Sequence, residues 1–548
     1  MTFTRDQFRA VHTQDKNFAV IAGAGSGKTH VLVSRFLYLL EQNPDWSLNA
    51  IVAITFTKKA AAEMRDRVRG QIEAQFFDAL THNNAPRADR WQRLLAQMDS
   101  ARITTIHGLC VEILRTNAAI LGIDPNFAVA EEVDNVTRLQ DVVEGVLDAV
   151  IKHDQALAEL FTYYPSADIR ATLTRPDLLN AEFALPNTPE ALLAQWTATQ
   201  KPLLQPIVAA MGELAHLADD LPVDDGFAQA LNQLLPFPDP ETIYANPSLL
   251  NDYFSTARLP LNKGARSGLV KEAKETVKGI RAIIERTFKN IHPDHERRSA
   301  ELLLLWGRLI ERVRDAYRAA KSRDNVLDFD DLERLACQLL SDEGVRARYQ
   351  NQEIKHVMVD EFQDTNAAQW QIVKGLADIN QAGALFVVGD PKQSIYAFRG
   401  ADVSVFGGVV DEISALTGIG EQISLSESFR THQPLVTTTN QLFGTLMAEE
   451  HAGDAGAYWV TLGEPMQAQR QQAPNPDPAL EVIAVINQPQ PDREQAPNYR
   501  EWEAHAIATR IHEWVNEERL IYDRHQRLTR PIRRHLNRSG VVKAAVMP

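Results

Sequence analysis

The stretch "NFAVIAGAGSGKTHVLVSRFLYLL" at residues 17–40 contains an apolar run, a glycine-rich turn and apolar residues at helical spacing. It therefore predicts a strand, a loop and a helix in that order. The loop matches the phosphate-binding pattern except at its first position, where the strict pattern has glycine and this chain has Ala22. Glycines let backbone N–H groups turn toward phosphate oxygens, because no Cβ stands in the way. We expect the nucleotide to be held by Ala22, Gly23, Ala24, Gly25, Ser26 and Gly27.

Two side chains at the start of the expected helix have the chemistry that a nucleotide requires. Lys28 supplies charge to the β- and γ-phosphates, and the Thr29 hydroxyl can ligate magnesium. The helix also presents its positive end to the same anion. ATP and Mg²⁺ are therefore the expected cofactors, and a chance glycine turn is the alternative.

Strands and helices alternate on both sides of the loop, which predicts an α/β fold with a parallel sheet. An amphipathic helix is expected near the end of the chain, at residues 501–518. The expected strands are residues 50–57, 101–107, 354–362, 383–390, 421–430 and 479–486.

Length and cysteine usage limit the class of protein. A chain of 548 residues suggests three or four domains at about 150 residues each. Only two cysteines occur, Cys110 and Cys337, which is typical of a reduced, cytoplasmic protein. The first residues have no apolar secretion signal, and no stretch approaches the ~20 apolar residues of a membrane span.

The charge distribution is uneven. The net charge of −15, taken alone, argues against a nucleic-acid partner. Between Arg258 and Arg323, however, 17 Lys and Arg stand against 8 Asp and Glu. This local excess suits duplex DNA, and solvated helix faces are the alternative interpretation.

The segment "VMVDEFQD" at residues 357–364 predicts a core strand that ends in two carboxylates. Ligands of open α/β sheets bind at the carboxyl ends of the strands. Asp360 there can hold magnesium, and Glu361 can polarise the attacking water. A pair of surface carboxylates is the alternative, and the upstream loop makes it the weaker one.

The segment "VVGDPKQSIYAFRG" at residues 387–400 combines an amide with two aromatic residues. Gln393 is neutral and can sense the γ-phosphate. Tyr396 and Phe398 stand beside basic residues, and aromatic rings form platforms for unpaired bases. Two core aromatics at strand spacing are the alternative.

Seven segments in order make the chain resemble a superfamily 1 DNA helicase of the UvrD/Rep class. The segment "LDFDDLE" at residues 327–333 and the long insertion make the AddA/RecB branch the nearest match. The matching segments are "FTRDQFRAV", "AGAGSGKT", "ITFTKKAAAEM", "TTIHGLC", "VDEFQDTN", "VVGDPKQSIYAFRGAD" and "LSESFRTHQPLV".

The resemblance implies roles for individual residues. Gln7 would read the adenine edge, although Thr4 and Gln7 also fit a helix capping box. Gln393 would couple the phosphate state to the DNA site, and Arg430 would reach the γ-phosphate. Lys28, Gln393 and Arg430 would thus act in catalysis with Glu361. The residues expected to face DNA are Phe56, Thr57, His107, Tyr396 and Phe398.

Two apparent metal signals are set aside. No cluster of further ligands accompanies His107 in the sequence. The stretch "HPDHERR", with His292 and His295, resembles a metal site only superficially.

The chain also departs from the pattern of that class. His30 stands where arginine is usual, and Phe398 where many relatives carry tryptophan. After "RPIR" the later motifs of the second core domain, its second arginine and a nuclease domain are absent. We therefore expect the residues from about Arg533 onward to be the remnant of a truncated or frame-shifted longer helicase.

The resemblance implies four parts and one activity. The parts are residues 1–118 (RecA-like ATP-binding core), 119–325 (helical insertion), 326–420 (remainder of the core) and 421–548 (partial second RecA-like domain). The implied activity is ATP-dependent 3′-to-5′ unwinding and translocation on single-stranded DNA in repair or recombination. The implied partners are single-stranded and duplex DNA and an AddB/RecC-like protein. The alternatives are an ATP- and DNA-binding module without unwinding, and a P-loop NTPase that acts on a protein or small molecule.

Overall fold

The computed structural model describes residues 3–175, 178–179, 184–289, 293–447, 463–471, 480–483, 499–517, 520–522 and 528–531. The chain divides into two compact units. One comprises Met1–Pro125 and Asp331–Pro548, and the other is Asn126–Asp330. The expected division into four parts remains a prediction.

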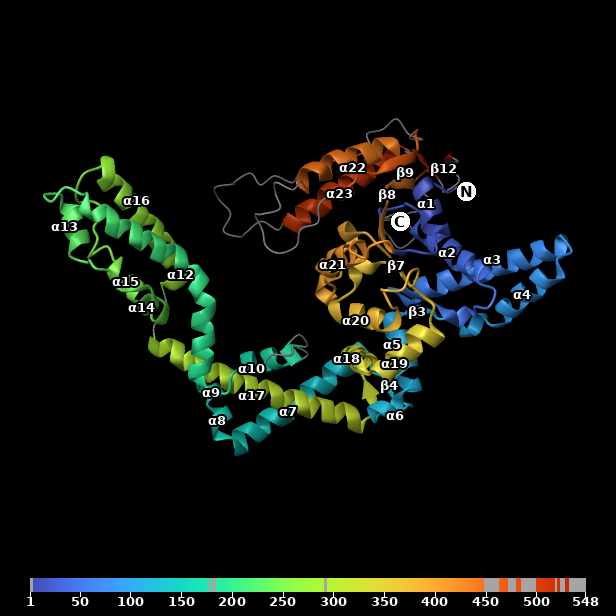
Figure 1. The fold of residues 1–548 in the computed structure, drawn as a ribbon, viewed down its shortest axis with the longest axis horizontal. Coiled ribbons are helices and arrows are strands. Elements are labelled where there is room, and N and C mark those ends of the chain that lie inside the picture. The colour runs from blue at the N-terminus through green and yellow to red at the C-terminus, as the bar shows by residue number, and fades with distance from the viewer. Residues whose placement is uncertain are drawn as a thin grey trace. The chain divides into compact units, whose positions relative to one another are not determined.

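A six-stranded sheet organises the first unit (Figure 1). Its order is β3-β2-β6-β7-β1-β8, and every pair of neighbours is parallel. The central strands are buried along their whole length, as expected for a parallel sheet covered on both faces. The expected α/β fold is confirmed. The strands are β1 Asn17–Ala22, β2 Ile51–Thr55, β3 Ile103–Thr105, β6 His356–Val359, β7 Leu385–Gly389 and β8 Gly420–Leu425.

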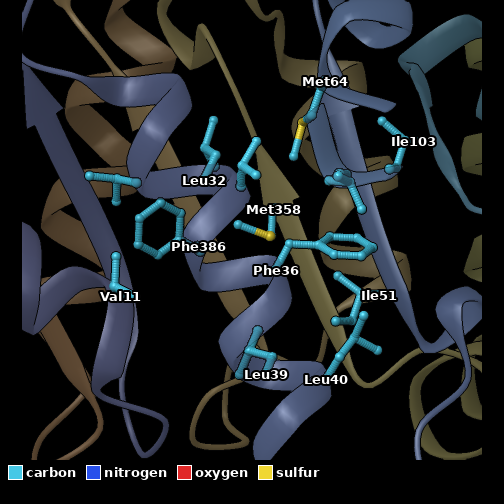
Figure 2. Close-up of a cluster of buried hydrophobic side chains, with 14 of the residues drawn as sticks. Val11, Leu32, Phe36, Leu39, Leu40, Ile51, Met64, Ile103, Met358 and Phe386 are labelled. Carbon is cyan, nitrogen blue, oxygen red and sulfur yellow. The ribbon is translucent and has the colours of Figure 1, made fainter. Parts of the chain in front are cut away.

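The core lies between this sheet and the helix that follows the phosphate loop. Phe36 of α2 (Lys28–Gln42) packs near Met358 of β6 and Ile51 of β2, as Figure 2 shows. Because α2 carries apolar residues at helical spacing, its whole inner face is buried. This packing holds the loop that precedes α2 against the ends of the strands.

The remaining helices of the first unit connect or extend the sheet strands. Two of the expectations for this unit are confirmed, since α2 and α23 lie at the expected places. The helices are α1 Arg5–His12, α3 Lys58–Thr81, α4 Ala85–Ala96, α5 Ile106–Thr116, α6 Ala118–Leu121, α18 Phe329–Ser341, α19 Glu343–Ala347, α20 Ala367–Leu376, α21 Val403–Ser414, α22 Gln433–Leu446 and α23 Tyr499–Asn516.

Four shorter strands lie outside the main sheet. The parallel pair β9 (Glu427–His432) and β10 (Gln467–Arg470) follows β8, and β11 (Leu520–Tyr522) pairs antiparallel with β12 (Leu528–Pro531). The expected strand at residues 421–430 is thus divided between β8 and β9.

Two sequence expectations require correction, and one lies outside the described residues. The strand expected at residues 101–107 ends at Thr105, because the Thr105 hydroxyl accepts from the Gly108 N–H and begins α5. Residues 480–483, the described part of the strand expected at 479–486, belong to no strand. The atypical segment from Arg533 onward is not among the described residues.

The second unit is helical, as its sequence pattern predicts. Within it α7 packs beside α17, and α12 packs against α16 (Figure 1). Two-residue strands, β4 Ala128–Val129 and β5 Val326–Leu327, pair where the chain enters and leaves the unit. The helices are α7 Glu132–His153, α8 Gln155–Ala158, α9 Leu160–Tyr163, α10 Ser166–Leu173, α12 Pro189–Asp219, α13 Gly226–Asn232, α14 Pro240–Ala245, α15 Leu249–Tyr253, α16 Gly268–Ile283 and α17 Pro293–Arg323.

Candidate nucleotide and DNA site

The loop between β1 and α2 has the backbone conformation of a phosphate cradle. Gly25 and Gly27 have φ of +75° and +83°, values that residues with a Cβ rarely adopt. No side chain among the described residues caps α2 at Gly27. The first N–H groups of α2 are therefore available to an anion, and the helix dipole favours one there.

The start of β9 lies against the same loop. The Gly25 carbonyl accepts from the Phe429 N–H at 2.9 Å, and the Ala24 carbonyl accepts from the Ser428 hydroxyl at 3.3 Å. A Cβ added to Gly25 would lie 2.6 Å from the Cβ of Arg430. The structure thus brings Arg430 beside the loop, some 400 residues away in sequence.

The two carboxylates after β6 lie at the same end of the sheet. Glu361 Oε2 accepts from the Lys28 ammonium at 2.8 Å, and Asp360 Oδ1 accepts from the Glu361 N–H at 3.0 Å. Glu361 has φ of +50°, the left-handed region, which costs about 1–3 kcal/mol for a residue with a side chain. Such strain persists where the surrounding structure enforces it, and it frequently marks a functional position.

Burial and mutual repulsion alter the acidity of this carboxylate group. Burial, and then the neighbouring Glu361, raise the pKa of Asp360 to about 6. The same two causes, in the same order, raise the pKa of Asp364 to about 6. Bringing a cation to this position relieves both effects, because it favours the ionised carboxylates.

The residues present fit ATP and magnesium. Thr29 lies in the first turn of α2, half-buried, and Asp360 supplies a carboxylate at the strand end. Hydroxyl and carboxylate oxygens suit Mg²⁺, which completes its shell with water and phosphate. The buried Ser26 hydroxyl and Asp364 Oδ1 have no hydrogen-bond partner among the described residues, as expected of a site built for a polar ligand.

Gln363 is a site residue that the sequence analysis quoted within its motif but did not select. Its Oε1 accepts from the Asp390 N–H at 2.9 Å, which fixes the orientation of the amide. Its Nε2 therefore donates to Glu361 Oε2 at 3.0 Å and to Asp364 Oδ2 at 3.3 Å. A Cβ on Gly389 would lie 2.6 Å from this Oε1, so the close approach requires glycine.

Gln393 is connected to the same group through Asp390. Its Nε2 donates to Asp390 Oδ2 at 2.7 Å, and Lys392 pairs with the other oxygen of Asp390 at 3.0 Å. Because the Asp390 N–H also donates to Gln363, three residues connect Gln393 with Glu361. The sequence analysis predicts that Gln393 senses the phosphate, and this network is its structural setting.

Gln7 forms the expected capping box and also contacts the loop. The Gln7 N–H donates to the Thr4 hydroxyl, and Gln7 Oε1 accepts from the Thr4 N–H. The Gln7 Nε2 donates to the Ser26 carbonyl at 2.9 Å. A carboxamide has two donor hydrogens and two acceptor lone pairs, so an adenine edge can still bind here. A small polar pocket adjoins this contact, lined by Thr4, Asp6, Gln7, Ser26, Ser424, Leu425, Ser426 and Glu427.

The three aromatic residues expected at the DNA face lie together. The ring centroids of Phe56 and Tyr396 are 4.5 Å apart, and those of Tyr396 and Phe398 are 5.9 Å apart. Phe398 is 78% exposed and lies in a 3₁₀ turn, Ala397–Arg399. The alternative of core aromatics in a strand is therefore wrong for Phe398.

The other two residues expected at DNA have structural partners. The Thr57 hydroxyl accepts from the Ala60 N–H and caps α3. His107 lies in the first turn of α5, where its Nε2 is 2.9 Å from Glu333 Oε1. Glu333 was not selected from the sequence, because nothing local in "LDFDDLE" indicates this distant contact.

Searches for other kinds of site gave two further findings. Within the described ranges, no group of three or more His, Cys, Asp or Glu side chains has an arrangement that can hold a metal ion. His292 is outside those ranges. Of the helices that the structure describes, none is both long and apolar enough to cross a membrane.

Comparisons with known proteins agree with the site. Three curated relatives share a name that describes the A subunit of an ATP-dependent helicase/nuclease. The protein of Exiguobacterium sibiricum is 31% identical across 96% of this chain and 46% of its own length. Those of Lactobacillus delbrueckii subsp. bulgaricus and Listeria innocua are 29% and 28% identical, across 82% and 97% of this chain and 40% and 46% of their own lengths.

The chain spans less than half the length of these curated relatives. They confirm the resemblance to the AddA branch. The family profile of the UvrD/REP helicase N-terminal domain matches residues 3–412, which confirms the RecA-like P-loop core. The chain therefore belongs to the UvrD/REP helicase family.

Proposed function

We propose that the chain is an ATP-dependent motor that moves 3′-to-5′ on single-stranded DNA and unwinds duplex DNA during repair or recombination. The observation that carries this proposal is the contact between Lys28 and Glu361 at the end of the parallel sheet. It joins the phosphate loop to the residue best placed to activate water. The family and the printed names of the relatives support the same activity.

Each catalytic residue has a role that follows from its position. Bound ATP supplies the phosphoryl group whose transfer to water releases the free energy for movement. Lys28 exchanges its pairing with Glu361 for the phosphates. Glu361, freed from Lys28 and still held by Gln363, orients water and accepts its proton. Thr29 and Asp360 hold Mg²⁺, and Arg430 stabilises negative charge on the transferred group.

The DNA face is proposed from the aromatic cluster. Phe56, Tyr396 and Phe398 offer stacking surfaces to successive bases, without sequence preference. Tyr396 and Phe398 follow Gln393 within five residues, so a change at the phosphate can move the platform. The direction of movement is taken from the family resemblance.

Further proposals concern the assembly. The printed name of the relatives describes one component of a helicase/nuclease with more than one polypeptide. We propose an AddB/RecC-like partner protein, a cytoplasmic location, and contact of duplex DNA with the basic stretch of residues 258–323. The four-part division into core, insertion, core and partial second core domain is proposed on the same basis.

One assay separates these functions. ATP hydrolysis is measured with and without single-stranded DNA, and unwinding is measured on duplexes with a 3′ or a 5′ tail. DNA-stimulated hydrolysis with unwinding from the 3′ tail alone supports the proposal. Binding of ATP and DNA without turnover indicates a binding module, and turnover indifferent to DNA indicates an NTPase with another substrate.

A further inference from the structure

Glu333 is a buried carboxylate that joins three separate parts of the first unit. It belongs to α18 and is 8% exposed. Its Oε1 lies 2.9 Å from His107 Nε2 and accepts from Gln369 Nε2 at 2.7 Å, while its Oε2 accepts from Asn366 Nδ2 at 3.0 Å. One side chain thus collects contacts from α5, from the N-terminus of α20 and from the first turn of α20.

The directions of these hydrogen bonds are determined. Asn366 caps α20 by accepting from the Gln369 N–H at 2.8 Å, so its Nδ2 must be the atom that faces Glu333. Burial alone would raise the pKa of Glu333, but hydrogen bonds from His107, Gln369 and Asn366 lower it overall. Glu333 is therefore an ionised acceptor. Because a carboxylate only accepts, His107 must carry its proton on Nε2, which fixes the tautomer and the orientation of the ring.

The same contacts reach the nucleotide site by a short path. Asn366 follows Glu361 by five residues, and three of those between them, Phe362, Gln363 and Asp364, form a buried 3₁₀ turn. The Asp364 N–H donates to the Glu361 carbonyl at 3.0 Å. A buried, hydrogen-bonded turn moves as a unit, so a shift at Glu361 is transmitted to Asn366 and Glu333.

We infer that Glu333 is a positioning residue that holds His107 toward single-stranded DNA and couples it to the nucleotide site. This path is separate from the one through Gln393, which runs by way of Asp390. The inference rests on the proposed function, because the contact between His107 and DNA belongs to that proposal. Glu333 itself touches neither ligand.

A double-mutant cycle with Glu333→Gln and His107→Ala tests the inference. The glutamine keeps the size of the side chain but directs an N–H₂ group at one of the three donors. We measure the affinity for labelled single-stranded DNA by fluorescence anisotropy, and the DNA concentration that half-activates ATP hydrolysis. Each single variant is expected to weaken DNA binding about tenfold, and the double variant no more than His107→Ala alone. The KM for ATP is expected to stay within about twofold, since the loop is not touched.

Glu412→Gln is the matched control. Glu412 accepts from Trp370 Nε1 and Lys374 Nζ, so it restrains α20 from another side without a bond to His107. It should leave DNA affinity unchanged. Additive losses in the double variant, or an equal loss in Glu412→Gln, would mean that Glu333 only stabilises the fold, and the inference would be wrong.

The two proposals can fail separately. Wild-type chain that binds DNA but does not hydrolyse ATP overturns the motor, and the anisotropy cycle still decides the role of Glu333. Wild-type chain that binds no single-stranded DNA overturns the inference about Glu333 together with the DNA face.

Discussion

The ammonium of Lys28 lies 2.8 Å from the carboxylate of Glu361, although the two residues are 333 positions apart. The pairing exists because β1 and β6 end at the same edge of the parallel sheet, with β7 between them. A cation and a carboxylate that pair with each other are both available to new partners when a triphosphate arrives. Their separation on binding is the first step that we expect in the cycle.

Lys28→Ala is expected to weaken nucleotide binding by about 10- to 150-fold. The estimate follows from about 1.5–3 kcal/mol for a hydrogen bond to a charged group. Titration with a fluorescent ATP analogue measures it. Lys374→Ala removes the same charge from the pair with Glu412, and it should bind as tightly as the wild type. Wild-type affinity in Lys28→Ala would show that the loop does not hold phosphate.

Glu361→Gln is expected to retain nucleotide and DNA binding while kcat falls by about 10²- to 10⁴-fold. The reason is that the amide cannot accept the proton of the attacking water. Steady-state hydrolysis in the presence of DNA and equilibrium nucleotide binding distinguish the two effects. The control is Glu353→Gln, at a carboxylate that pairs with Arg102. If Glu361→Gln hydrolysed ATP at the full DNA-stimulated rate, another group would be the base.

Phe398→Ala is expected to weaken binding of single-stranded DNA by about 5- to 150-fold. Stacking of a base on an aromatic side chain contributes about 1–3 kcal/mol. Fluorescence anisotropy with a labelled oligonucleotide is the measurement. Phe77→Ala is the control, because Phe77 on α3 is also an exposed aromatic residue, at 61% against 78% for Phe398. Equal affinities for the two variants would contradict the stacking role.

The pH dependence of stability is expected to reveal the raised pKa of Asp360. A carboxyl group with an ordinary pKa of 3.8 and a pKa of about 6 in the fold binds more protons in the folded state between those values. Its contribution to stability is therefore present below about pH 4 and is lost as the pH rises through 6. Asp360→Asn lacks this titration, so its free energy of unfolding should rise relative to the wild type from pH 4 to pH 7.

Urea denaturation of the nucleotide-free protein at several pH values provides that comparison. Taking the difference between variant and wild type removes the contributions of other groups, such as the buried His356, whose pKa burial lowers to about 3. A difference that stays constant across the range would contradict the raised pKa. Magnesium affinity is expected to increase as the pH rises through 6, because the ion requires the charged carboxylate.

The sequence by itself determined the local parts of this protein. The apolar run before Gly23, the glycines of the loop and the apolar spacing after Lys28 predict β1, the cradle and α2, since each depends on residues near in the chain. The carboxylates that end β6 are predictable for the same reason. The order of seven motifs was sufficient to indicate the family, which the family profile confirms.

Only the tertiary structure decided which distant groups meet. The order β3-β2-β6-β7-β1-β8 brings Glu361 to Lys28, and no local pattern states that order. The bonds of Gln363 to Glu361 and Asp390, and of Glu333 to His107, depend on packing across the sheet and between helices. Local propensity acts over a few residues, whereas a buried amide or carboxylate is satisfied by whichever donors the fold brings within about 3 Å.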